Sequence, residues 1–426
     1  MADFLAFPPA RQLSGSLRVP SSKSATNRAL VLAALTASPV EIVRPLESDD
    51  TRVLVRCLAT MGARIVPIEE GLRVSGPLGA PGRGEVALDA GDSGTAARFL
   101  AAVASATPGD FLLDGSRRLR ERPMGELVAA LREAGARIED RGEPGRLPLG
   151  IRGGGLASRE ISVDASRSSQ FVSALLLAAV AVEGGLRVRP SGTVASEPYV
   201  ASTLEALRAF GHAASGADGV FAAGRGERVA KRWTAPGDYS SAVTLVAAVG
   251  AAGGDIVLSG LRWPSPDADA RALPVLSAMG ISIEPSAEGI RVRAEREALG
   301  PAVATATDFP DAVPALAALA ALAPGASVFS GIGHLKIKES DRLVALETLA
   351  RAAGASAEAS EDGLRVTGPV PENGGARRLP TFRDHRIAMA AAIVALRVRG
   401  ILVEDPGCVA KSYPDFFRDL ESLVRR

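Results

Sequence analysis

Apolar and polar positions follow a pattern that recurs about every seventy residues along this chain. The pattern predicts an amphipathic helix that ends at a glycine, followed by a strand of alternating apolar and polar residues, a tight turn and a second strand. Glycine supplies the left-handed backbone that ends many helices, and short alternating runs around a turn are typical of strands. The closing glycines, 73, 76, 69 and 74 residues apart, are Gly62, Gly135, Gly211, Gly280 and Gly354.

A second kind of helix recurs with the same period and is apolar on almost every side. A helix without a polar face is buried all round, so we expect these helices at the centre of the fold. The amphipathic helices keep a polar face and are expected further out. The six apolar helices begin near Ser22, Asp92, Ser168, Asp238, Asp308 and Asp384.

Six strand–helix–strand–helix–strand–strand (βαβαββ) units predict an α/β protein of two similar lobes, with sheets outside and apolar helices inside. The last amphipathic helix, Ser412 to Arg426, has no strands after it, and the segment from Phe4 to Val19 is available to supply them. The array would then close on itself and bring its two ends together. The alternative is an ordinary α/β protein with accidental periodicity, which six matched copies disfavour.

Composition narrows the classes of function. The 426 residues are 47% hydrophobic and 23% charged, and a formal net charge of +1 does not favour binding of a polyanion. Aromatic residues make up only 4%, too few to suggest base-stacking platforms. Cys57 and Cys408 have no paired spacing, which argues against a disulfide framework or a thiolate zinc site. With no long apolar run and no signal-peptide pattern, we expect a cytoplasmic protein.

Positive charges gather where the repeated helices begin. Helix N-termini carry a partial positive charge and unpaired N–H groups, which suit anions. Only five of the 49 basic residues are lysines, so a lysine here marks a place for a compact ammonium. Each cation alone would be an ordinary surface charge, but together they predict a site for a small, strongly anionic ligand. They are Lys23, Arg28, Arg98, Arg122, Lys338, Arg342, Arg386 and Lys411.

Two carboxylates, Asp311 and Glu339, lie beside these cations in the sequence. A carboxylate in a cationic, partly desolvated site is a natural proton shuttle, whereas the alternative role of each is to cap a helix. The chain has no Walker loop, no G-x-G-x-x-G after a strand and no cluster with metal-ligand spacing. We therefore expect chemistry that uses no cofactor and no metal.

Eight motifs resemble the 5-enolpyruvylshikimate-3-phosphate (EPSP) synthase family and occur in the family's order. They run from residue 22 to residue 412, so the resemblance covers essentially the whole chain. The motifs are Ser22–Leu30, Gly91–Arg98, Glu121–Pro123, Ser168–Phe171, Pro310–Ala312, Lys338–Leu343, Asp384–Arg386 and Ala410–Ser412.

The resemblance implies transfer of the enolpyruvyl group of phosphoenolpyruvate to the 5-hydroxyl of shikimate 3-phosphate, with release of phosphate, in chorismate biosynthesis. It implies the enolpyruvyl transferase fold, a two-lobed inside-out α/β barrel. Lobe I would be residues 1–20 plus 239–426, lobe II would be residues 21–238, and the active site would lie in the cleft between them. We expect a monomer whose partners are these two small molecules, with no nucleic acid and no membrane.

The resemblance also implies roles for individual residues. The catalytic groups would be Asp311 at the hydroxyl, Glu339 near the methylene carbon, and Lys23. Shikimate 3-phosphate would be bound by Lys23, Ser24, Arg28, Ser168, Ser169, Gln170, Ser196, Asp311, His334 and Lys338. Phosphoenolpyruvate would be bound by Lys23, Gly94, Arg122, Gln170, Arg342, Arg386 and Lys411.

The chain departs from the family pattern in a few places. Asp92 and His334 stand where many members have Asn, and Glu197 follows Ser196 in a segment, with Tyr199, that usually helps to hold the phosphate of shikimate 3-phosphate. We expect the Asp92 carboxylate to weaken binding of phosphoenolpyruvate by repulsion.

Three alternative functions are open at this point. The nearest is the sister enzyme that transfers enolpyruvyl to UDP-N-acetylglucosamine, which typically has a reactive cysteine in the loop before the Arg-Pro motif. That loop, residues 114–120, has no cysteine here. An RNA-phosphate-processing protein is disfavoured by the balanced charge and scarce aromatic residues, and a non-catalytic scaffold is the third alternative.

Overall fold

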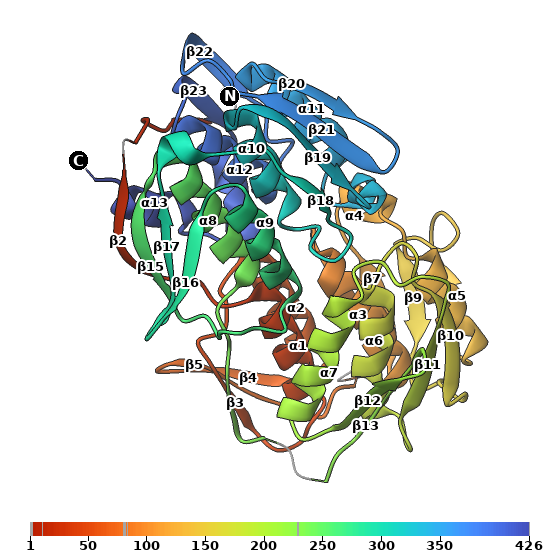
Figure 1. Cartoon of the computed structure of the whole chain (residues 1–426). Helices are drawn as coiled ribbons and strands as arrows, with labels where there is room; N and C mark the ends of the chain where they lie inside the picture. Colours follow the sequence, from red (N-terminus) through yellow and green to blue (C-terminus); the bar gives the residue numbers. More distant parts are fainter. Residues whose placement is uncertain (1–2, 11, 80–81, 83, 228–229, 426) are drawn as a thin grey trace. The chain divides into compact units, whose positions relative to one another are not determined.

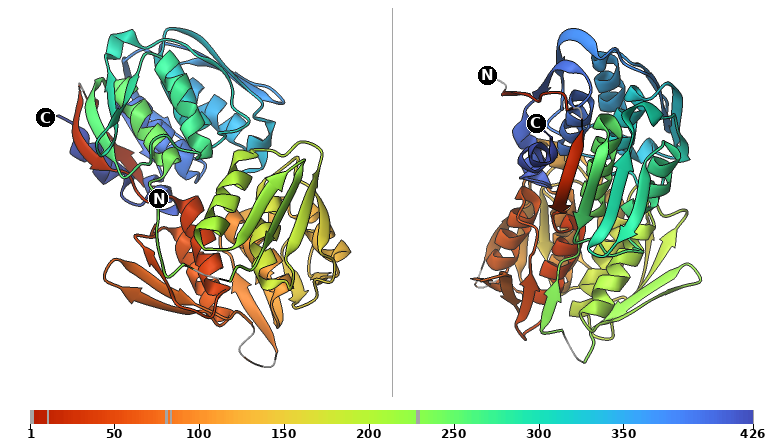
Figure 2. Two further views of the ribbon diagram at one scale, coloured as in Figure 1. Left: turned by 60° about the horizontal axis from the view of Figure 1, so that its bottom comes forward. Right: turned by 60° about the vertical axis from the view of Figure 1, so that its left-hand side comes forward.

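The computed structural model describes residues 3–10, 12–79, 82, 84–227 and 230–425. The chain divides into two compact units, which we call unit 1 (Met1–Pro20 with Pro236–Arg426) and unit 2 (Ser21–Ala235). Each unit has three sheets on its outside and helices inside (Figures 1 and 2). Each unit also has its own hydrophobic core, made only of its own residues.

The sheets of unit 2 are three copies of one plan. Its strands are β3 (Val40–Val43), β4 (Arg64–Ile68), β5 (Gly71–Ser75), β6 (Glu85–Asp89), β7 (Asp110–Asp114), β8 (Arg137–Asp140), β9 (Leu149–Arg152), β10 (Glu160–Asp164), β11 (Leu186–Ser191), β12 (Ala213–Ala217), β13 (Val220–Gly224) and β14 (Arg232–Thr234). The strand orders are β14–β3–β5–β4, β6–β7–β9–β8 and β10–β11–β13–β12. In each sheet the first two strands are parallel and the other pairs are antiparallel.

Unit 1 repeats this plan twice and varies it once. Its strands are β1 (Phe4–Ala6), β2 (Leu13–Arg18), β15 (Gly254–Ser259), β16 (Ser282–Ser286), β17 (Gly289–Ala294), β18 (Val303–Thr305), β19 (Gly325–Ser330), β20 (Ser356–Ala359), β21 (Gly363–Gly368), β22 (Asn373–Leu379) and β23 (Arg399–Glu404). The orders are β2–β15–β17–β16, β18–β19–β21–β20 and, with three strands among the described residues, β22–β23–β1.

The predicted use of the N-terminal segment is correct for β1 and wrong for β2. Strand β1 pairs antiparallel with β23 and so completes the last sheet. Strand β2 instead pairs in parallel with β15, in the sheet of the fourth repeat. The array does close as predicted, because Leu13 forms a bridge with Val424 and Arg425 N donates to Gln12 O at 3.1 Å.

The chain crosses from one unit to the other twice, and each crossing directly follows a strand. Strand β2 directly precedes α1 of unit 2 but pairs with β15 in a sheet of unit 1. Strand β14 directly precedes α8 of unit 1 but pairs with β3 in a sheet of unit 2. The change back to unit 1 falls at residue 235, since Ala235 N donates to Val43 O and Gly237 N donates to Gly260 O. The two passages are adjacent, because Asp238 N donates to Pro20 O at 2.8 Å.

Helices form an inner and an outer set, as the two kinds of helical pattern predict. The inner helices are α1 (Lys23–Ala34), α3 (Gly94–Ala106) and α6 (Gln170–Ala178) in unit 2, and α8 (Tyr239–Ala252), α10 (Val313–Leu322) and α12 (His385–Ala395) in unit 1. Every residue of α8, α10 and α12 is buried. The outer helices are α2 (Asp49–Thr60), α4 (Arg117–Glu121), α5 (Gly125–Glu133), α7 (Pro198–Ala209), α9 (Leu273–Ala278), α11 (Arg342–Ala353) and α13 (Phe416–Leu423).

Short 3₁₀ helices join several of these elements. They are η1 (Ala179–Ala181), η2 (Ala268–Ala272), η3 (Arg296–Ala298), η4 (Gly333–Ile337) and η5 (Pro406–Lys411). None of the helices among the described residues is both long enough and apolar enough to cross a membrane.

The five closing glycines end their helices as predicted. Each has a left-handed backbone, with φ between +85° at Gly211 and +103° at Gly354. At Gly62 the glycine N–H donates to Ala59 O at 2.9 Å, and the next N–H, of Ala63, donates to Leu58 O at 3.0 Å. The same pair of bonds recurs at the other four glycines and satisfies carbonyls that the helix leaves unpaired.

Candidate active site

The beginnings of three helices in unit 1 are joined through the guanidinium of Arg342, the first residue of α11. Its side chain is only 1% exposed. Nη1 donates to Asp311 Oδ1 at 2.9 Å and Nη2 donates to Glu339 Oε2 at 2.9 Å. Nε donates to Asp384 Oδ2 at 2.8 Å. Three carboxylates therefore meet at one buried cation, just before α10, α11 and α12.

Neither Asp311 nor Glu339 caps a helix, so the alternative role considered for them does not hold. The N-cap of α10 is Ala312, without a side-chain cap, and that of α11 is Asp341, which accepts from Val344 N. Burial alone would raise the pKa of Asp311, but the charges of Arg386, Arg342 and Lys338 outweigh it and hold that pKa well below its ordinary value. Asp311 is thus ionised beside three cations.

Arg386, the second residue of α12, extends this cluster to α8. Its Nη2 donates to Ser240 Oγ at 2.7 Å and lies 3.4 Å from Asp311 Oδ2. Ser240 Oγ in turn donates to Asp238 Oδ2 at 2.6 Å. The Nε and Nη1 atoms of Arg386 are buried without a hydrogen-bond partner among the described residues. A buried guanidinium with two nitrogen atoms whose N–H groups are unused is suited to an incoming anion.

The remaining predicted residues of unit 1 are Lys338, His334 and Lys411. Lys338 follows η4, the 3₁₀ helix that contains His334, and Lys411 is the buried last residue of η5. Burial and the charge of Lys338 lower the pKa of His334 to about 4. His334 is therefore neutral near pH 7 and can offer one N–H, as the Asn common at this position would.

In unit 2, Lys23 is the first residue of α1 and contacts a buried acid. Its Nζ lies 3.1 Å from Asp50 Oδ2 of α2, and its side chain is 16% exposed. Ser22 caps the helix by accepting from Ala25 N. The Lys23 ammonium is thus partly enclosed. This fits the inference that a lysine in this arginine-rich chain marks a position for a compact ammonium.

The five N–H groups of Arg28 are accounted for by bonds to protein atoms. Nε donates to Thr203 Oγ1 at 2.7 Å, and Nη1 donates to Ser24 Oγ at 2.6 Å and to Ser24 O at 2.9 Å. Nη2 donates to Tyr199 O at 3.0 Å and to Ser173 Oγ at 3.4 Å. Arg28 therefore ties the beginnings of α1, α6 and α7 together.

A second network of unit 2 orients Gln170, the first residue of α6. Arg98 Nη1 donates to Gln170 Oε1 at 2.6 Å, and Gln170 Nε2 donates to Thr95 Oγ1 at 3.2 Å. Nearby, the guanidinium of Arg122 lies directly against Gly94, where a Cβ atom would be 2.5 Å from Arg122 Nη1. Glycine at position 94 is thus what lets Arg122 reach the start of α3.

The other three predicted serines and Asp92 lie at helix beginnings as well. Ser168 Oγ accepts from Gln170 N at 3.2 Å, and Ser169 is the buried N-cap of α6. Ser196, before α7, is buried with a left-handed φ of +56°, a strained conformation that is found more often at functional sites. Asp92 is exposed and accepts a hydrogen bond from Ser116.

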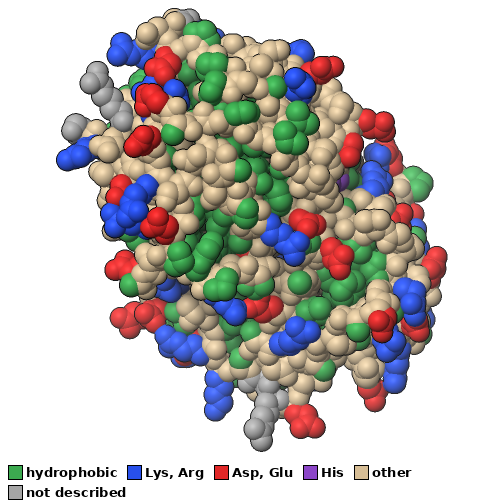
Figure 3. Space-filling view, viewed as in Figure 1, with side chains coloured by type: hydrophobic (Ala, Val, Ile, Leu, Met, Phe, Trp, Pro, Cys, Tyr) green, Lys and Arg blue, Asp and Glu red, His purple; other side chains and the backbone are tan. Residues whose placement is uncertain are grey.

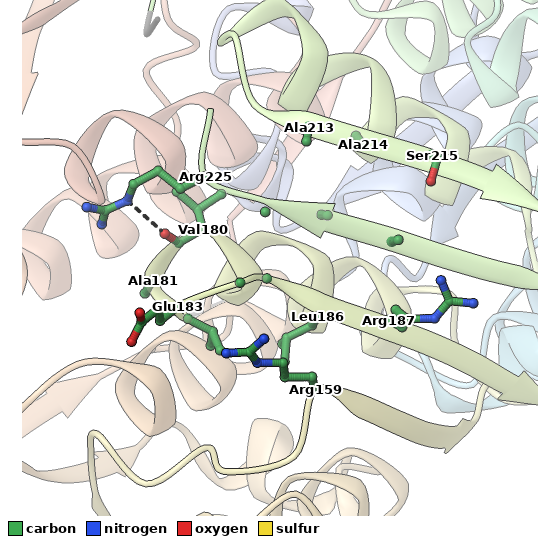
Figure 4. Close-up of a pocket in the computed structure, with 16 residues that line it drawn as sticks. Arg159, Val180, Ala181, Glu183, Leu186, Arg187, Ala213, Ala214, Ser215 and Arg225 are labelled. Atoms are coloured by element: carbon green, nitrogen blue, oxygen red, sulfur yellow. Dashed lines mark hydrogen bonds between the residues drawn. The ribbon is translucent and has the colours of Figure 1, made fainter. Parts of the chain in front are cut away.

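A hollow of about 940 Å³ lies elsewhere, on the third sheet of unit 2 (Figure 4). It is lined by Arg159, Arg187 and Arg225 among others, and by none of the predicted site residues. Arg187 and Arg225 point away from each other, and Arg225 Nε donates to Val180 O. These arginines do not converge on one ligand.

Sequence reasoning missed Asp50, Asp238, Ser240 and Asp384 as members of these clusters. Asp384 lies inside a recognised motif, so the motif could have pointed to it, whereas nothing in the local pattern distinguishes Asp50 from other acids in the first turn of a helix. Among the described residues, no group of three or more His, Cys, Asp or Glu side chains is placed to hold a metal ion.

Comparisons with known proteins show the family of the chain. A family profile described as EPSP synthase (3-phosphoshikimate 1-carboxyvinyltransferase) matches residues 8–420. A 3-phosphoshikimate 1-carboxyvinyltransferase from Syntrophobacter fumaroxidans is 38% identical and covers 97% of this chain and 98% of the relative. One from Methanoculleus marisnigri is 37% identical and covers 94% of each.

Solved structures give the same result. The EPSP synthase from Acinetobacter baumannii has a TM-score of 0.81 and 27% identity, covering 100% of this chain and 98% of that one. The enolpyruvyl transferase NikO from Streptomyces tendae shares the fold, with a TM-score of 0.77 and 21% identity over 98% of this chain and 96% of that one. With the enolpyruvyl transferase fold, the motif residues at its helix beginnings and this full-length similarity, the chain belongs to the EPSP synthase family.

Proposed function

We propose that this protein transfers the enolpyruvyl group of phosphoenolpyruvate to the 5-hydroxyl of shikimate 3-phosphate and releases phosphate. The observation that carries the proposal is the placement of Asp311, Glu339 and Arg386 around the buried Arg342. Two carboxylates beside fixed cations are what an addition and elimination between two anionic substrates needs. Family membership and the named relatives support the same reaction.

Phosphoenolpyruvate is held in this proposal by cations at helix beginnings. The two substrates together bring about six negative charges, whose mutual repulsion must be offset by positive charge. Two buried nitrogen atoms of Arg386, Nε and Nη1, have N–H groups to spare, and Arg122 is positioned by Gly94. The proposed ligands of phosphoenolpyruvate are Lys23, Gly94, Arg122, Gln170, Arg342, Arg386 and Lys411.

Shikimate 3-phosphate is held in this proposal by hydroxyl, amide, imidazole and charged groups of the predicted residues. Ser168, Ser169 and Gln170 offer hydroxyl and amide groups at the start of α6, and neutral His334 offers an N–H. Arg28 serves mainly by fixing Ser24 and the start of α7, because its own N–H groups are already used. The other proposed ligands are Lys23, Ser196, Asp311 and Lys338.

The catalytic groups of the proposal are Asp311 and Glu339, which transfer protons, and Lys23. In the addition step, Asp311 accepts the proton of the attacking 5-hydroxyl while Glu339 donates a proton to the methylene carbon of phosphoenolpyruvate. In the elimination step, the new methyl group returns a proton to Glu339 as the carbon–oxygen bond to phosphate breaks, and the proton held by Asp311 leaves with the phosphate. Lys23 offsets negative charge that builds up between the two substrates.

The transfer of enolpyruvyl to UDP-N-acetylglucosamine is not favoured. The sister enzyme's reactive cysteine has no counterpart in residues 114–120. Burial and the nearby charge of Asp89 raise the pKa of Cys57 to about 11, and burial with Asp405 raises that of Cys408 to about 12. Neither thiol is therefore a ready nucleophile near pH 7.

An RNA-binding function finds no support on the outer sheet faces, where charges of opposite sign are paired. Arg73 bonds Glu41 at 2.8 Å and Arg291 bonds Asp255 at 2.6 Å. On the face shown in Figure 3, basic and acidic side chains lie next to one another at many points. Such a surface lacks the continuous basic stripe that nucleic-acid binding uses.

Release of phosphate from mixtures of the two substrates tests the proposal. We expect release only when phosphoenolpyruvate and shikimate 3-phosphate are both present, and none when UDP-N-acetylglucosamine replaces the latter. If phosphate were released with UDP-N-acetylglucosamine as acceptor and not with shikimate 3-phosphate, the protein would have the activity of the sister enzyme instead. We also propose a monomer, which sedimentation velocity tests.

Asp311→Asn gives the sharper test of mechanism. The amide keeps the shape of the side chain but cannot accept the hydroxyl proton, so turnover is expected to fall by about 10²- to 10⁴-fold while calorimetry still detects binding of shikimate 3-phosphate. The matched control is Asp308→Asn, since Asp308 pairs with Arg271 at 2.6 Å and not with the cluster. Equal turnover of both variants would remove Asp311 from the proton transfer.

A further inference from the structure

Asp384 is a buried carboxylate that joins two arginines of the candidate active site. Its side chain is 0% exposed. Oδ2 accepts from Arg342 Nε at 2.8 Å and from Ser340 Oγ at 3.0 Å. Oδ1 accepts from Arg342 Nη2 at 3.3 Å and from the backbone N–H of Arg386 at 2.9 Å. One side chain thus binds the guanidinium of one arginine and the backbone of the other.

This geometry fixes the plane of the Arg342 guanidinium. Two oxygens of one carboxylate on two nitrogens of one guanidinium allow a single relative orientation of the two groups. Because both groups are buried, water cannot take over these bonds at low cost. With Nε and part of Nη2 held by Asp384, the rest of the guanidinium faces Asp311 and Glu339.

The same carboxylate sets the start of α12, where Arg386 lies. As the N-cap of this helix, Asp384 holds the N–H of Arg386 and so fixes where its side chain leaves the backbone. Arg342 and Arg386 come from different helices, α11 and α12. Asp311 also contacts both guanidinium groups, but Asp384 alone of the two binds the guanidinium of Arg342 and the backbone N–H of Arg386. Asp384 therefore makes the start of α12 depend on the position of Arg342.

A strained turn precedes Asp384. Its N–H donates to Thr381 O at 2.9 Å, and the two residues between them, Phe382 and Arg383, have left-handed φ angles of +53° and +55°. Each such residue other than glycine costs about 1–2 kcal/mol. Phe382 gains little burial in return, since it is 43% exposed. Strain of this kind persists where the surrounding structure imposes it.

We propose that Asp384 is a positioning residue that orients Arg342 and Arg386 together toward phosphoenolpyruvate, and that the turn from Thr381 holds it in place. This inference rests on the proposed function. Asp384 touches neither substrate; it acts through the two arginines. Its loss is therefore expected to change the affinity for phosphoenolpyruvate far more than the affinity for shikimate 3-phosphate.

Asp384→Asn separates this role from helix capping. The amide oxygen can still accept the N–H of Arg386, but the negative charge and one acceptor for Arg342 are lost. Since a buried hydrogen bond to a charged group contributes strongly, KM for phosphoenolpyruvate is expected to rise about 10- to 100-fold. KM for shikimate 3-phosphate is expected to change less than about two-fold. A residue that only caps α12 would leave both constants near wild type in the Asn variant.

The matched control is Asp341→Asn. Asp341 caps α11, the helix that carries Arg342, by accepting from Val344 N at 3.2 Å. The control removes the same charge from a helix cap of the same unit without touching the guanidinium bonds of Asp384. We expect unchanged Michaelis constants for this variant.

Ser340→Ala provides a milder second variant, in case Asp384→Asn does not fold. It removes one bond to Asp384 and keeps every charge, so KM for phosphoenolpyruvate is expected to rise two- to five-fold, in line with the loss of one neutral hydrogen bond. If KM for phosphoenolpyruvate is unchanged in Ser340→Ala and in any folded Asp384→Asn protein, this inference is wrong while the proposed function stands. A wild-type protein that releases no phosphate overturns it together with the proposed function.

Discussion

Two buried arginines at helix beginnings, Arg28 and Arg342, differ in what their N–H groups reach. Arg28 donates to hydroxyl and carbonyl oxygens, whereas Arg342 donates to three carboxylates. Both were predicted from motif position as ligands of substrate, and the motifs do mark the right helices. The motifs could not tell which N–H groups are already occupied, because that depends on side chains far away in sequence, such as Thr203 and Asp384.

Lys23 gives the first prediction at this scale. In Lys23→Arg the charge is kept, but a larger, planar guanidinium replaces the compact ammonium at a partly enclosed position beside Asp50. We expect kcat/KM to fall at least about 100-fold, as for the loss of a well-placed group in the transition state. The control is Lys231→Arg at an exposed position. Near wild-type turnover of Lys23→Arg would show that charge alone is needed there.

Gly94 gives the second prediction at the scale of single residues. In Gly94→Ala the new methyl group would lie 2.5 Å from Arg122 Nη1, so the guanidinium must move. Overpacking of this kind costs about 1–3 kcal/mol, and KM for phosphoenolpyruvate is expected to rise about ten-fold. Gly300→Ala is the control, because a Cβ atom there meets nothing within 4 Å. The explanation would be wrong if the two variants behaved alike.

Elements that repeat could be predicted well, and elements that pair over long distances could not. The closing glycines and apolar helices are local patterns, and the structure has both where the pattern predicts them. Helix α10 begins at Val313, later than the Asp308 predicted, because a turn from Phe309 to Ala312 comes first. The pairing of β2 with β15 has no local signal at all, since some 240 residues separate them.

The turn before α12 carries the prediction at the scale of an element. Arg383→Gly removes the left-handed strain at one residue, partly offset by the greater freedom of glycine in the unfolded chain. The free energy of unfolding is therefore expected to rise by about 0.5–1 kcal/mol. Arg365→Gly, at an exposed position in the extended strand β21, is expected to lower it instead. Urea denaturation compares the two, and equal losses would mean that the turn is not strained.

At the scale of the whole molecule, the two units have separate cores and separate reporters. The chain has two tryptophans: Trp233 lies in β14 of unit 2 and Trp263 follows β15 in unit 1. Unfolding of one unit can therefore be followed by itself after the other tryptophan is replaced by Phe. This matters for acid stability, because the pKa of buried His212 in unit 2 and of half-buried His334 in unit 1 is lowered.

His212 gives the prediction for unit 2. Burial and the charge of Arg225 lower its pKa to about 4, from 6.5 for a free side chain, while its Nδ1 accepts from Gly226 N. Below pH 6.5 the imidazole of His212 is protonated in the unfolded chain, whereas in the folded unit it stays neutral down to about pH 4. The free energy of unfolding of unit 2 therefore falls by roughly 3 kcal/mol as the pH is lowered from 6.5 to 4, and His212 does not change it above pH 6.5.

The variant His212→Asn keeps an acceptor for Gly226 N and removes the titration. In a Trp263→Phe background, its free energy of unfolding is expected to fall less steeply between pH 6.5 and 4 than that of the parent. Above pH 7 the two curves are expected to run parallel. Parallel curves through the acid range as well would mean that His212 is not buried in the neutral form.

The pairing of β2 with the distant β15 also bears on how the chain assembles during synthesis. The described strands of unit 2 all come from residues 21–235, so this unit can fold as soon as it leaves the ribosome. Strand β2 has to wait for β15, a delay of about 10 to 45 seconds at 5–20 residues per second. An unpaired strand is open to wrong partners during that time. Its sequence, Leu-Ser-Gly-Ser-Leu-Arg, has only two large apolar residues in six, which limits that risk while the strand waits for its neighbour.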